Sequence, residues 1–346
     1  MKNENAPRRV TWQRVSLIVL CVLLTLVLAA MIAATAYVHH LLSFITGGEN
    51  GEINATLPPE VLATATSHPT IDPGYTGPST EYVPQETLPP VVDDKDVVNI
   101  ILIGEDRKGE KYRQRSDSMI LCSFNTKTNT LTMISFLRDT YISKIPGFGG
   151  DKLNAAYQLG GARTLNQTLG AYFGVHVDAS IAVQFEGFMG IVDMLGGVDI
   201  TLTKKEAKHM NSENEGWNLQ EGKNHLTGEQ ALFYSRIRKL DMDAVRAQRQ
   251  RNVLTALINS FKHQPIGDMV TLAKDILATG FIQTDMSTDE VMYYIQKLFP
   301  MLAGMEIGSQ QIPAEGTYTN MAVGNVMDAK VCDLEANRKI LQAILN

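Results

Sequence analysis

Three short apolar segments decide the fold of this chain: Val97–Gly104 (VVNIILIG), Met119–Phe124 (MILCSF) and Leu131–Phe136 (LTMISF). The first is a short apolar run that ends in glycine, which is typical of a buried β-strand. The other two also predict strands, and the residues between them, NTKTN at 125–129, favour a hairpin turn. The folded part of the chain therefore begins near Val97.

Helix and strand patterns alternate downstream of these segments, which indicates one mixed α/β domain over residues 97–346. The segment Asn154–Phe173 predicts a helix that is interrupted at Gly160-Gly161. The other expected elements are a strand Ser180–Phe185, a helix Glu186–Leu195, a strand Val198–Leu202, a helix through Tyr234 opened by a capping box at Thr227, a helix Asp243–Phe261, a helix to Leu298 opened by a capping box at Ser287, and a final helix Ala329–Leu345.

A basic tail and an uncharged segment open the chain. Residues 1–14 carry a local charge of +3, and residues 15–38 contain no charged residue over 24 positions. A helix of that length spans about 36 Å, enough for the apolar core of a bilayer. A cleaved signal peptide is the alternative, because Ala34-Thr35-Ala36 resembles a cleavage site, but its apolar region is usually shorter. We therefore expect a single-pass transmembrane signal-anchor in the cell membrane, with a cytoplasmic tail and an extracytoplasmic domain.

Residues 39–96 form an acidic, proline-rich segment. They hold eight of the 13 prolines and a net charge of −8, so we expect an extended stalk that buries no core. The whole chain has a net charge of −6, which argues against a bulk-basic nucleic-acid binder. Because the stalk carries most of this acidity, the domain beyond it is nearly neutral, and anionic ligands are not excluded. Three cysteines exclude a disulfide framework, although one bridge, Cys122–Cys332, is left open.

Two aspartates lie at the ends of expected strands. Asp106 follows the strand that ends at Gly104, and Asp117 precedes the strand that starts at Met119. Ligands commonly bind at strand ends in α/β sheets, and two carboxylates brought together there could hold Mg²⁺ through their oxygens. The alternative is ordinary turn chemistry, since aspartate is common in turns.

A basic segment follows the helix expected to end at Tyr234. It contains Arg236, Arg238, Lys239, Arg246, Arg249 and Arg251, together with Gln250. Arg246 and Gln250 are four positions apart and share a helical face, whereas Arg236 and Arg238 would share a face in extended backbone. Clustered guanidinium groups suit a multi-oxygen anion such as phosphate or pyrophosphate. The alternative is a solvated basic helix paired with Asp241 and Asp243.

Arg138-Asp139, directly after the strand that ends at Phe136, is either a further anion ligand or a local ion pair in a turn.

The familiar nucleotide and hydrolase motifs are missing from the sequence, which has no G-x-x-x-x-G-K-[ST], no H-E-x-x-H and no G-x-S-x-G. Candidates to line an apolar pocket are Phe185, Phe188, Met189, Ile191 and Val192, although ordinary core packing is the more usual role of any one of them.

Taken in order, several segments resemble the LytR–CpsA–Psr family of cell-envelope proteins. The matching segments are RSDSM at 115–119, SFLRDT at 135–140, IPGFG at 145–149, DKLNAAY at 151–157, GG at 160–161, VDMLGGVD at 192–199, YSRIR at 234–238 and Arg246 to Gln250. The resemblance covers roughly 99–261, and the short tail with one span also fits the family. Two departures are Leu137, where the family usually has proline, and a shorter segment between Arg238 and Arg246.

The resemblance implies a mixed sheet flanked by helices, with a tunnel for a lipid tail. It also implies an Mg²⁺-dependent phosphotransferase that moves a glycopolymer, such as wall teichoic acid or capsule, from a polyprenyl-pyrophosphate carrier to peptidoglycan. By position, the implied catalytic residues are Asp106, Asp117, Arg115 and Arg138, with Asp106 and Asp117 as metal ligands, and the implied substrate-binding residues are Arg236, Arg238, Lys152, Arg246 and Gln250.

Two other functions remain open at this point. A polyprenyl-pyrophosphate hydrolase would use the same residues with water as the acceptor, so the sequence does not separate the two reactions. A non-catalytic lipid-phosphate sensor or transcription attenuator is the third reading. Direct contact with DNA is not expected, because only residues 1–14 would face the cytoplasm. The expected partners are the lipid-linked glycan, peptidoglycan and the membrane bilayer.

Overall fold

The computed structural model of this chain describes residues 95–105, 113–240, 243–263, 268, 271–272, 275–276, 279–302 and 304–345. The expected tail, transmembrane anchor and nearly all of the stalk lie outside the described residues, as do Asp106 and Asp241. Among the residues that are described, no helix combines the length and the apolar character needed to cross a membrane.

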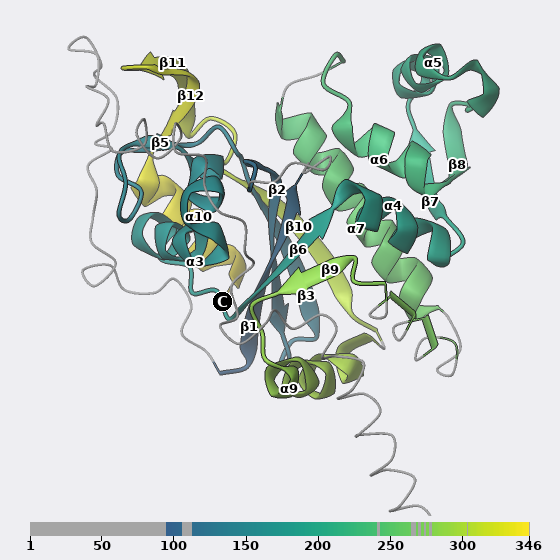
Figure 1. Cartoon of the computed structure of the whole chain (residues 1–346), viewed down its shortest axis with the longest axis horizontal. Helices are drawn as coiled ribbons and strands as arrows, with labels where there is room; N and C mark the ends of the chain where they lie inside the picture. The colour runs from purple at the N-terminus through teal and green to yellow at the C-terminus, as the bar shows by residue number, and fades with distance from the viewer. Residues whose placement is uncertain are drawn as a thin grey trace, which may run out of the picture.

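A six-stranded mixed sheet forms the centre of the molecule, in the order β10-β3-β2-β1-β6-β9 (Figure 1). Its strands are β1 (Val97–Glu105), β2 (Ser116–Asn125), β3 (Thr130–Phe136), β6 (Ala179–Gln184), β9 (Ile282–Thr284) and β10 (Glu306–Ile312). β1 runs antiparallel to β2 and parallel to β6, while β10 runs parallel to β3. The expected mixed α/β sheet is confirmed, including the hairpin between β2 and β3.

Helices cover both faces of this sheet, which explains why β1 is apolar along nearly its whole length. Ile101 and Ile103 belong to a buried cluster with α3 (Leu153–Phe173) and α10 (Leu334–Leu345). Val98 and Ile100 point to the other face, where they pack with residues of α9 (Thr288–Leu298). The alternation of side chains along a strand assigns these two sets to opposite faces.

The predicted interruption of α3 is confirmed. Gly160 and Gly161 have non-helical backbone angles, and Gly161 adopts a φ of +68°. A Cβ atom at Gly161 would lie 3.2 Å from the guanidinium of Arg113. Position 161 therefore favours glycine for two reasons, its backbone conformation and the close approach of an arginine.

A second group of elements packs beside the sheet around its own core. It comprises α4 (Phe185–Met194), β7 (Val198–Leu202), α5 (Lys204–Glu213), η2 (Glu215–Trp217), β8 (Gly222–Leu226), α6 (Gly228–Arg236) and α7 (Asp243–Lys262). The capping boxes expected at Thr227 and Ser287 are both present, and Thr203 forms another with Glu206. Figure 1 shows this group on one side of the sheet and α3 with α10 on the other.

The C-terminal segment differs from the prediction of one helix over Ala329–Leu345. β12 (Val326–Cys332) pairs with β11 (Tyr318–Val323), and α10 begins only at Leu334. Asp333 explains the boundary, because its carboxylate accepts a hydrogen bond from the backbone N–H of Ala336, as a helix N-cap does. The remaining short elements are β4 (Tyr141–Ile142), β5 (Asp151–Lys152) and η3 (Phe299–Leu302).

The bridge left open between Cys122 and Cys332 does not form, and placing Cys332 in a helix was wrong. Both thiols are free and buried. Cys122 lies in a cluster with Leu131 and Met133 on one face of the sheet. Cys332 is in β12 and packs in the cluster around α3 and α10, so the two sulfurs belong to separate cores.

Candidate functional site

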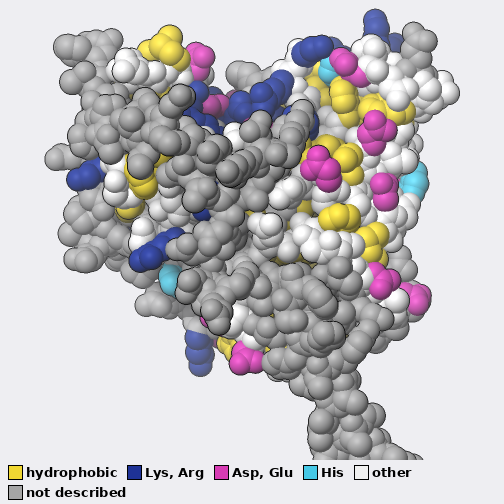
Figure 2. Space-filling view, in the orientation of Figure 1, with side chains coloured by type: hydrophobic (Ala, Val, Ile, Leu, Met, Phe, Trp, Pro, Cys, Tyr) yellow, Lys and Arg dark blue, Asp and Glu magenta, His cyan; other side chains and the backbone are white. Residues whose placement is uncertain are grey.

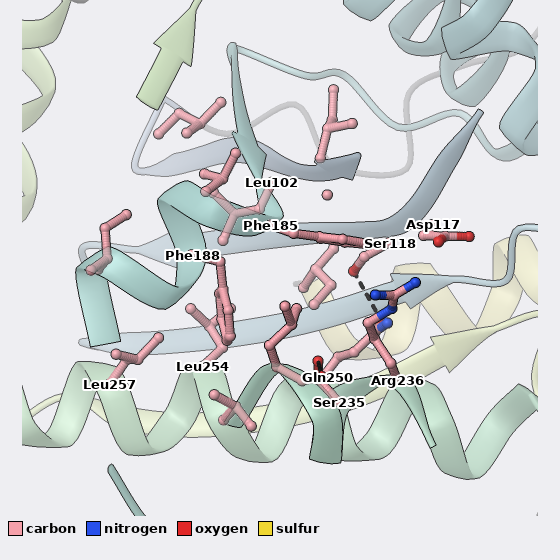
Figure 3. A pocket seen from close by; sticks show the side chains of 18 of the residues that line it. Leu102, Asp117, Ser118, Phe185, Phe188, Ser235, Arg236, Gln250, Leu254 and Leu257 are labelled. Carbon is pink, nitrogen blue, oxygen red and sulfur yellow. Dashed lines mark hydrogen bonds between the residues drawn. The ribbon is translucent and has the colours of Figure 1, made fainter. Parts of the chain in front are cut away.

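A cavity of about 300 Å³ lies between the central sheet and helices α4, α6 and α7 (Figure 3). Its walls are mostly apolar: Leu102, Ile103, Ile120, Ile181, Val183, Phe185, Phe188, Ile191, Leu232, Val253, Leu254, Leu257 and Ile282. Val253, Leu254 and Leu257 come from one face of α7, as their spacing predicts. Phe185, Phe188 and Ile191 line the cavity as proposed from the sequence, whereas Val192 is buried in the core of the second group.

Polar side chains gather at one end of this cavity. They are Asp117, Ser118, Ser235, Arg236, Arg238, Arg246 and Gln250. In Figure 3, Asp117 and Ser118 lie at the end opposite Leu257, and the Ser118 hydroxyl donates to Gln250 Oε1 at 3.0 Å. Arg246 and Gln250 both face the cavity from α7, which confirms the prediction from their spacing of four.

Asp117 is the centre of the polar end. Its Oδ1 accepts a hydrogen bond from Arg138 Nη1 at 2.8 Å and another from Arg238 Nη2 at 3.3 Å. Both nitrogens come from segments distant in sequence, since Arg138 follows β3 and Arg238 follows α6. The fold thus brings one carboxylate and two guanidinium groups together, and their hydrogen bonds are charge-assisted.

Asp243 adds a second acidic group beside these arginines. Its Oδ1 lies 2.6 Å from Arg246 Nη2 and 3.9 Å from Arg138 Nε. Burial lowers the pKa of Arg246 despite the charge of Asp243. Burial acts in the same direction on Arg138, but Asp139, Asp243 and Asp117 outweigh it, so the pKa of Arg138 is raised.

Arg236 is held by an aromatic contact. Its guanidinium carbon lies 4.3 Å from the centre of the Phe185 ring, a cation–π contact at the boundary between the polar and apolar parts of the cavity. Arg236 ends α6, and Ile237 after it is buried in the second core. Arg236 and Arg238 therefore both line the cavity, while the residue between them points away, as the sequence predicts.

Arg115 and Lys152 do not line the cavity. Arg115 Nη2 pairs with Asp151 at 2.7 Å, and its Nη1 donates to Asn154 at 3.3 Å. Lys152 Nζ pairs with Asp139 at 2.9 Å. The Lys152–Asp139 pair is linked to the polar end of the cavity by Arg138, whose Nε lies 3.4 Å from Asp139 and whose Nη1 donates to Asp117. Both alternatives considered for Arg138-Asp139 therefore hold: the two residues form a local ion pair, and Arg138 also contacts Asp117 in the site.

The electrostatics of Asp139 follow from these neighbours. Burial raises the pKa of its carboxyl group, but the hydrogen bond from Lys152 and the charges of Arg138, Lys152 and Lys330 lower it further, and the net shift is downward. Asp139 therefore stays ionised and fixes the two cations. Figure 2 shows Lys and Arg side chains gathered in this region, between the two groups of helices.

Two arginines of the basic segment have other roles. Arg249 is 3% exposed, and its Nε donates to Glu206 Oε1 at 2.7 Å while its Nη1 donates to the backbone oxygen of Ile237 at 3.3 Å. Arg251 is 4% exposed, and burial lowers its pKa to about 10. Neither lines the cavity, so the basic segment divides into a half that faces the site and a half that is buried elsewhere.

Sequence reasoning missed Ser118, Ser135 and Ser235 and gave Asp243 only a pairing role. Ser135 and Asp243 line a second, smaller cavity of about 10 Å³ together with Asp117, Arg138 and Arg246. A signal was available for Ser118 and Ser235, because each is the direct neighbour of a candidate residue. Ser135 gave none. The signal for Asp243 was its local pairing with the basic helix, and only the tertiary structure adds Asp117 and Arg138 beside it.

A metal ion at the polar end of the cavity would need carboxylate oxygens as ligands. Within the described residues, no three acidic, histidine or cysteine side chains gather as a ready metal site. Asp117 is the one described candidate ligand, and Asp106, its expected partner, lies outside the described residues. Mg²⁺ commonly binds through one or two carboxylates and the phosphates of a substrate, so Asp117 fits such a role without a complete protein cage.

The chain is similar to known proteins in sequence and in fold. The model of the LytR_cpsA_psr family matches residues 73–341. A polyisoprenyl-teichoic acid–peptidoglycan teichoic acid transferase TagU from Bacillus mycoides is 34% identical over 201 residues, covering 56% of this chain and 64% of the relative. The corresponding TagU of Oceanobacillus iheyensis is 34% identical over 246 residues, covering 68% and 73%. The chain thus matches slightly under two thirds of the Bacillus mycoides protein.

Solved structures show the same fold. TagT bound to LI-WTA has a TM-score of 0.58 and 27% identity, with 78% of this chain and 99% of that chain covered. TagT with bound octaprenyl pyrophosphate lipid has a TM-score of 0.55 and 26% identity, with the same coverage. The mixed sheet flanked by helices, expected from the sequence, is therefore the fold of these neighbours.

Proposed function

The chain belongs to the LytR_cpsA_psr family, and from this premise we propose that it moves a glycopolymer from a polyprenyl-pyrophosphate carrier to peptidoglycan. One observation carries the proposal: a single cavity joins apolar walls to an end with Arg236, Arg238 and Arg246. A ligand that matches it has an apolar chain attached to a multiply charged anion. Polyprenyl pyrophosphate has that chemistry, and a similar protein, TagT, is known with octaprenyl pyrophosphate bound.

The arginines account for recognition of the head group. Guanidinium groups bind phosphate oxygens through paired N–H donors and keep their charge when partly buried. Arg236 stands at the boundary of the two parts of the cavity, where its contact with Phe185 orients it. Arg238 and Arg138 share Asp117 as a counter-ion, so both are ordered before substrate binds.

The proposed reaction breaks the phosphoanhydride bond of the donor. A hydroxyl oxygen of peptidoglycan attacks the phosphorus that carries the glycan, and a new P–O bond forms. The bond from that phosphorus to the bridging oxygen breaks, and polyprenyl phosphate leaves with the electron pair. Arg138, Arg236, Arg238 and Arg246 stabilise the charge that develops on the leaving phosphate. The hydroxyl proton passes to a carboxylate, for which Asp117 is the described candidate.

We also propose that Mg²⁺ assists at the polar end. Asp117 and Asp106 would hold it, and the ion would supply additional charge stabilisation on the phosphate oxygens. The anchor at 15–38 and the stalk at 39–96 complete the proposal. They place the domain outside the cell membrane, in the compartment that contains peptidoglycan, and keep it near a lipid-linked donor.

The test is a transfer assay with the full chain in vesicles. The donor is a polyprenyl-pyrophosphate glycan, the acceptor is a soluble peptidoglycan fragment, and the reaction contains Mg²⁺. We expect Asp117→Asn and Arg236→Gln to lower transfer by about a hundredfold or more, the usual cost of removing one group that stabilises transition-state charge. Lys239→Gln is the control, because Lys239 is exposed and pairs with Glu213 outside the cavity.

Three results would contradict the proposal. Transfer that is unchanged in both site variants would show that the cavity is not the active site. Release of glycan phosphate at the same rate with and without acceptor would identify a hydrolase. Binding of the donor without any turnover would favour a sensor.

A further inference from the structure

Helix α9 carries an unusual share of the exposed apolar surface. Five large hydrophobic side chains of the described residues are exposed, and three of them lie within seven positions: Tyr293 at 54%, Ile295 at 43% and Phe299 at 41%. Ile295 and Phe299, the first residue of η3, are four positions apart and lie on one side of the exposed surface, whereas Tyr293 lies on the other side. Single exposed apolar residues are ordinary, but three within about two turns of helix favour an interaction site. We call Tyr293, Ile295 and Phe299 the α9 rim.

The rim lies at the end of the molecule where the described chain begins. Lys297, between rim residues on α9, donates from Nζ to the backbone oxygen of Lys95 at 2.7 Å. Lys95 is the first described residue, and the 94 residues before it include the uncharged segment 15–38. Figure 1 shows α9 at one end of the molecule and the β11–β12 hairpin at the other. The rim therefore lies at the end of the molecule where the described chain begins.

The buried side of α9 reaches the apolar walls of the cavity. Tyr294 and Leu298 pack in a cluster with Leu102 and Ile181, and both of the latter line the cavity. Leu298 and Leu254 of α7, another lining residue, also pack against one further buried cluster. One helix thus has its inner side against the cavity walls and its outer side exposed. The helix that carries the rim therefore shares its buried clusters with the walls of the site proposed for the polyprenyl chain.

The residue types fit the surface of a bilayer. Aromatic residues are enriched where headgroups meet hydrocarbon, and lysine reaches past an apolar body to keep its charge in water. Lys297 Nζ lies 5.7 Å from the Tyr293 ring, so the rim combines both features. The cavity, at about 300 Å³, is at the small end of ligand pockets. A long polyprenyl chain extends beyond it and needs apolar surroundings outside.

We propose that the α9 rim docks on the lipid bilayer and sets the distance between the membrane and the cavity. This inference rests on the proposed function, because it assigns the rim to delivery of a membrane-held donor. The stalk alone does not fix that distance, since an extended segment allows many positions. Docking by the rim would keep the apolar end of the cavity beside the lipid in which the donor is dissolved.

The first experiment measures depth in the bilayer. The full chain with Cys21→Ala is reconstituted in vesicles and labelled with an environment-sensitive fluorophore at Ile295→Cys. Cys122 and Cys332 are buried and free, with pKa values of about 12, so they stay unlabelled under native conditions. Met327→Cys is the matched control, because Met327 is 64% exposed on the distant hairpin. We expect bromolipids to quench the label at 295 and not the label at 327.

The second experiment measures the consequence for transfer. The double variant Ile295→Gln, Phe299→Gln should lower transfer from a long-chain donor in vesicles by roughly tenfold, the effect of losing about two partly buried apolar groups. Transfer from a short-chain, water-soluble donor should stay unchanged. Met327→Gln should alter neither rate.

The outcomes separate the inference from the function on which it rests. Equal quenching at 295 and 327 would overturn docking, and so would equal loss of transfer with both donors. Protection of position 295 from iodide without quenching by lipid would mean that another protein segment, or a second copy, covers the rim. If the unmodified chain transferred neither donor, the proposed function itself would fall, whereas quenching at 295 would still support docking.

Discussion

The buried ion pair between Arg249 and Glu206 holds the segment that carries Arg236 and Arg238, so replacing Arg249 tests how that segment is fixed. Arg249 also donates to the backbone oxygen of Ile237, the residue between Arg236 and Arg238. Glu206 and Arg249 have side chains that are only 9% and 3% exposed. Replacing Arg249 by methionine leaves the Glu206 carboxylate buried opposite an apolar group and releases the turn that positions two arginines.

The expected loss of unfolding free energy is about 3–5 kcal/mol, the usual cost of breaking one partner out of a buried ion pair. For a domain of this size about 2–4 °C of melting temperature corresponds to 1 kcal/mol, so the midpoint should fall by about 6–20 °C. Fluorescence of Trp217 reports the transition directly, because that side chain packs in the same core as Tyr234 and Ile237.

Arg251 supplies a matched control on the same helix. It is equally buried, yet burial is the one influence on its lowered pKa, and Nε and Nη1 have no hydrogen-bond partner among the described residues. Arg251→Met should therefore cost less than about 1 kcal/mol or stabilise, since it removes a charge without leaving an unpaired one. Equal destabilisation by both variants would refute this reasoning, as would a large gain of stability in Arg249→Met.

Three further predictions concern groups away from the cavity. The hydrogen bonds to Asp199 and to the backbone oxygen of Gly196 raise the pKa of His225 above 6.5, so its contribution to stability is full below that value and is lost as pH rises through the folded pKa. NMR titration should show the raised pKa, and Asp199→Asn should lower it towards the ordinary value. Burial raises the pKa of Cys122 and Cys332 to about 12, so thiol reagents at pH 8 should modify neither cysteine before the protein unfolds. Mass spectrometry would follow the modification, and rapid labelling of the native protein would contradict this prediction. Gly161→Ala should destabilise by about 1–3 kcal/mol in urea unfolding, because a φ of +68° strains any residue with a Cβ; an unchanged midpoint would show that the kink relaxes at no cost.

Local patterns predicted much of the fold because they reflect burial close in sequence. The apolar runs of β1, β2 and β3, the glycine interruption of α3 and the capping boxes at Thr227 and Ser287 each have a local physical cause. β10 was missed for the opposite reason. Its sequence, EIGSQQI, has no apolar run or strict alternation, and it becomes a strand by pairing with β3.

The site was predicted in part for similar reasons. Helical spacing placed Arg246 and Gln250 correctly, and the alternation around Ile237 placed Arg236 and Arg238. The strand end expected before Met119 placed Asp117 in the site, but nothing in the sequence predicted its partner Arg238, which lies 121 positions later. The positions of Arg115 and Lys152 away from the cavity, and the approach of Asp243 to Arg138, follow from long-range packing that no local pattern encodes.

The parallel pairing of β10 with β3 has a consequence for how the chain matures. β3 is synthesised long before the strand that covers its outer edge, residues 306–312. Until those residues are made, the apolar strand β3 has unpaired backbone groups along one side and invites association with other chains. β10 then becomes the edge strand of the sheet, but its sequence EIGSQQI is more polar than that of β3 and is less prone to such pairing. A product that ends before β10 is therefore a hazard for aggregation.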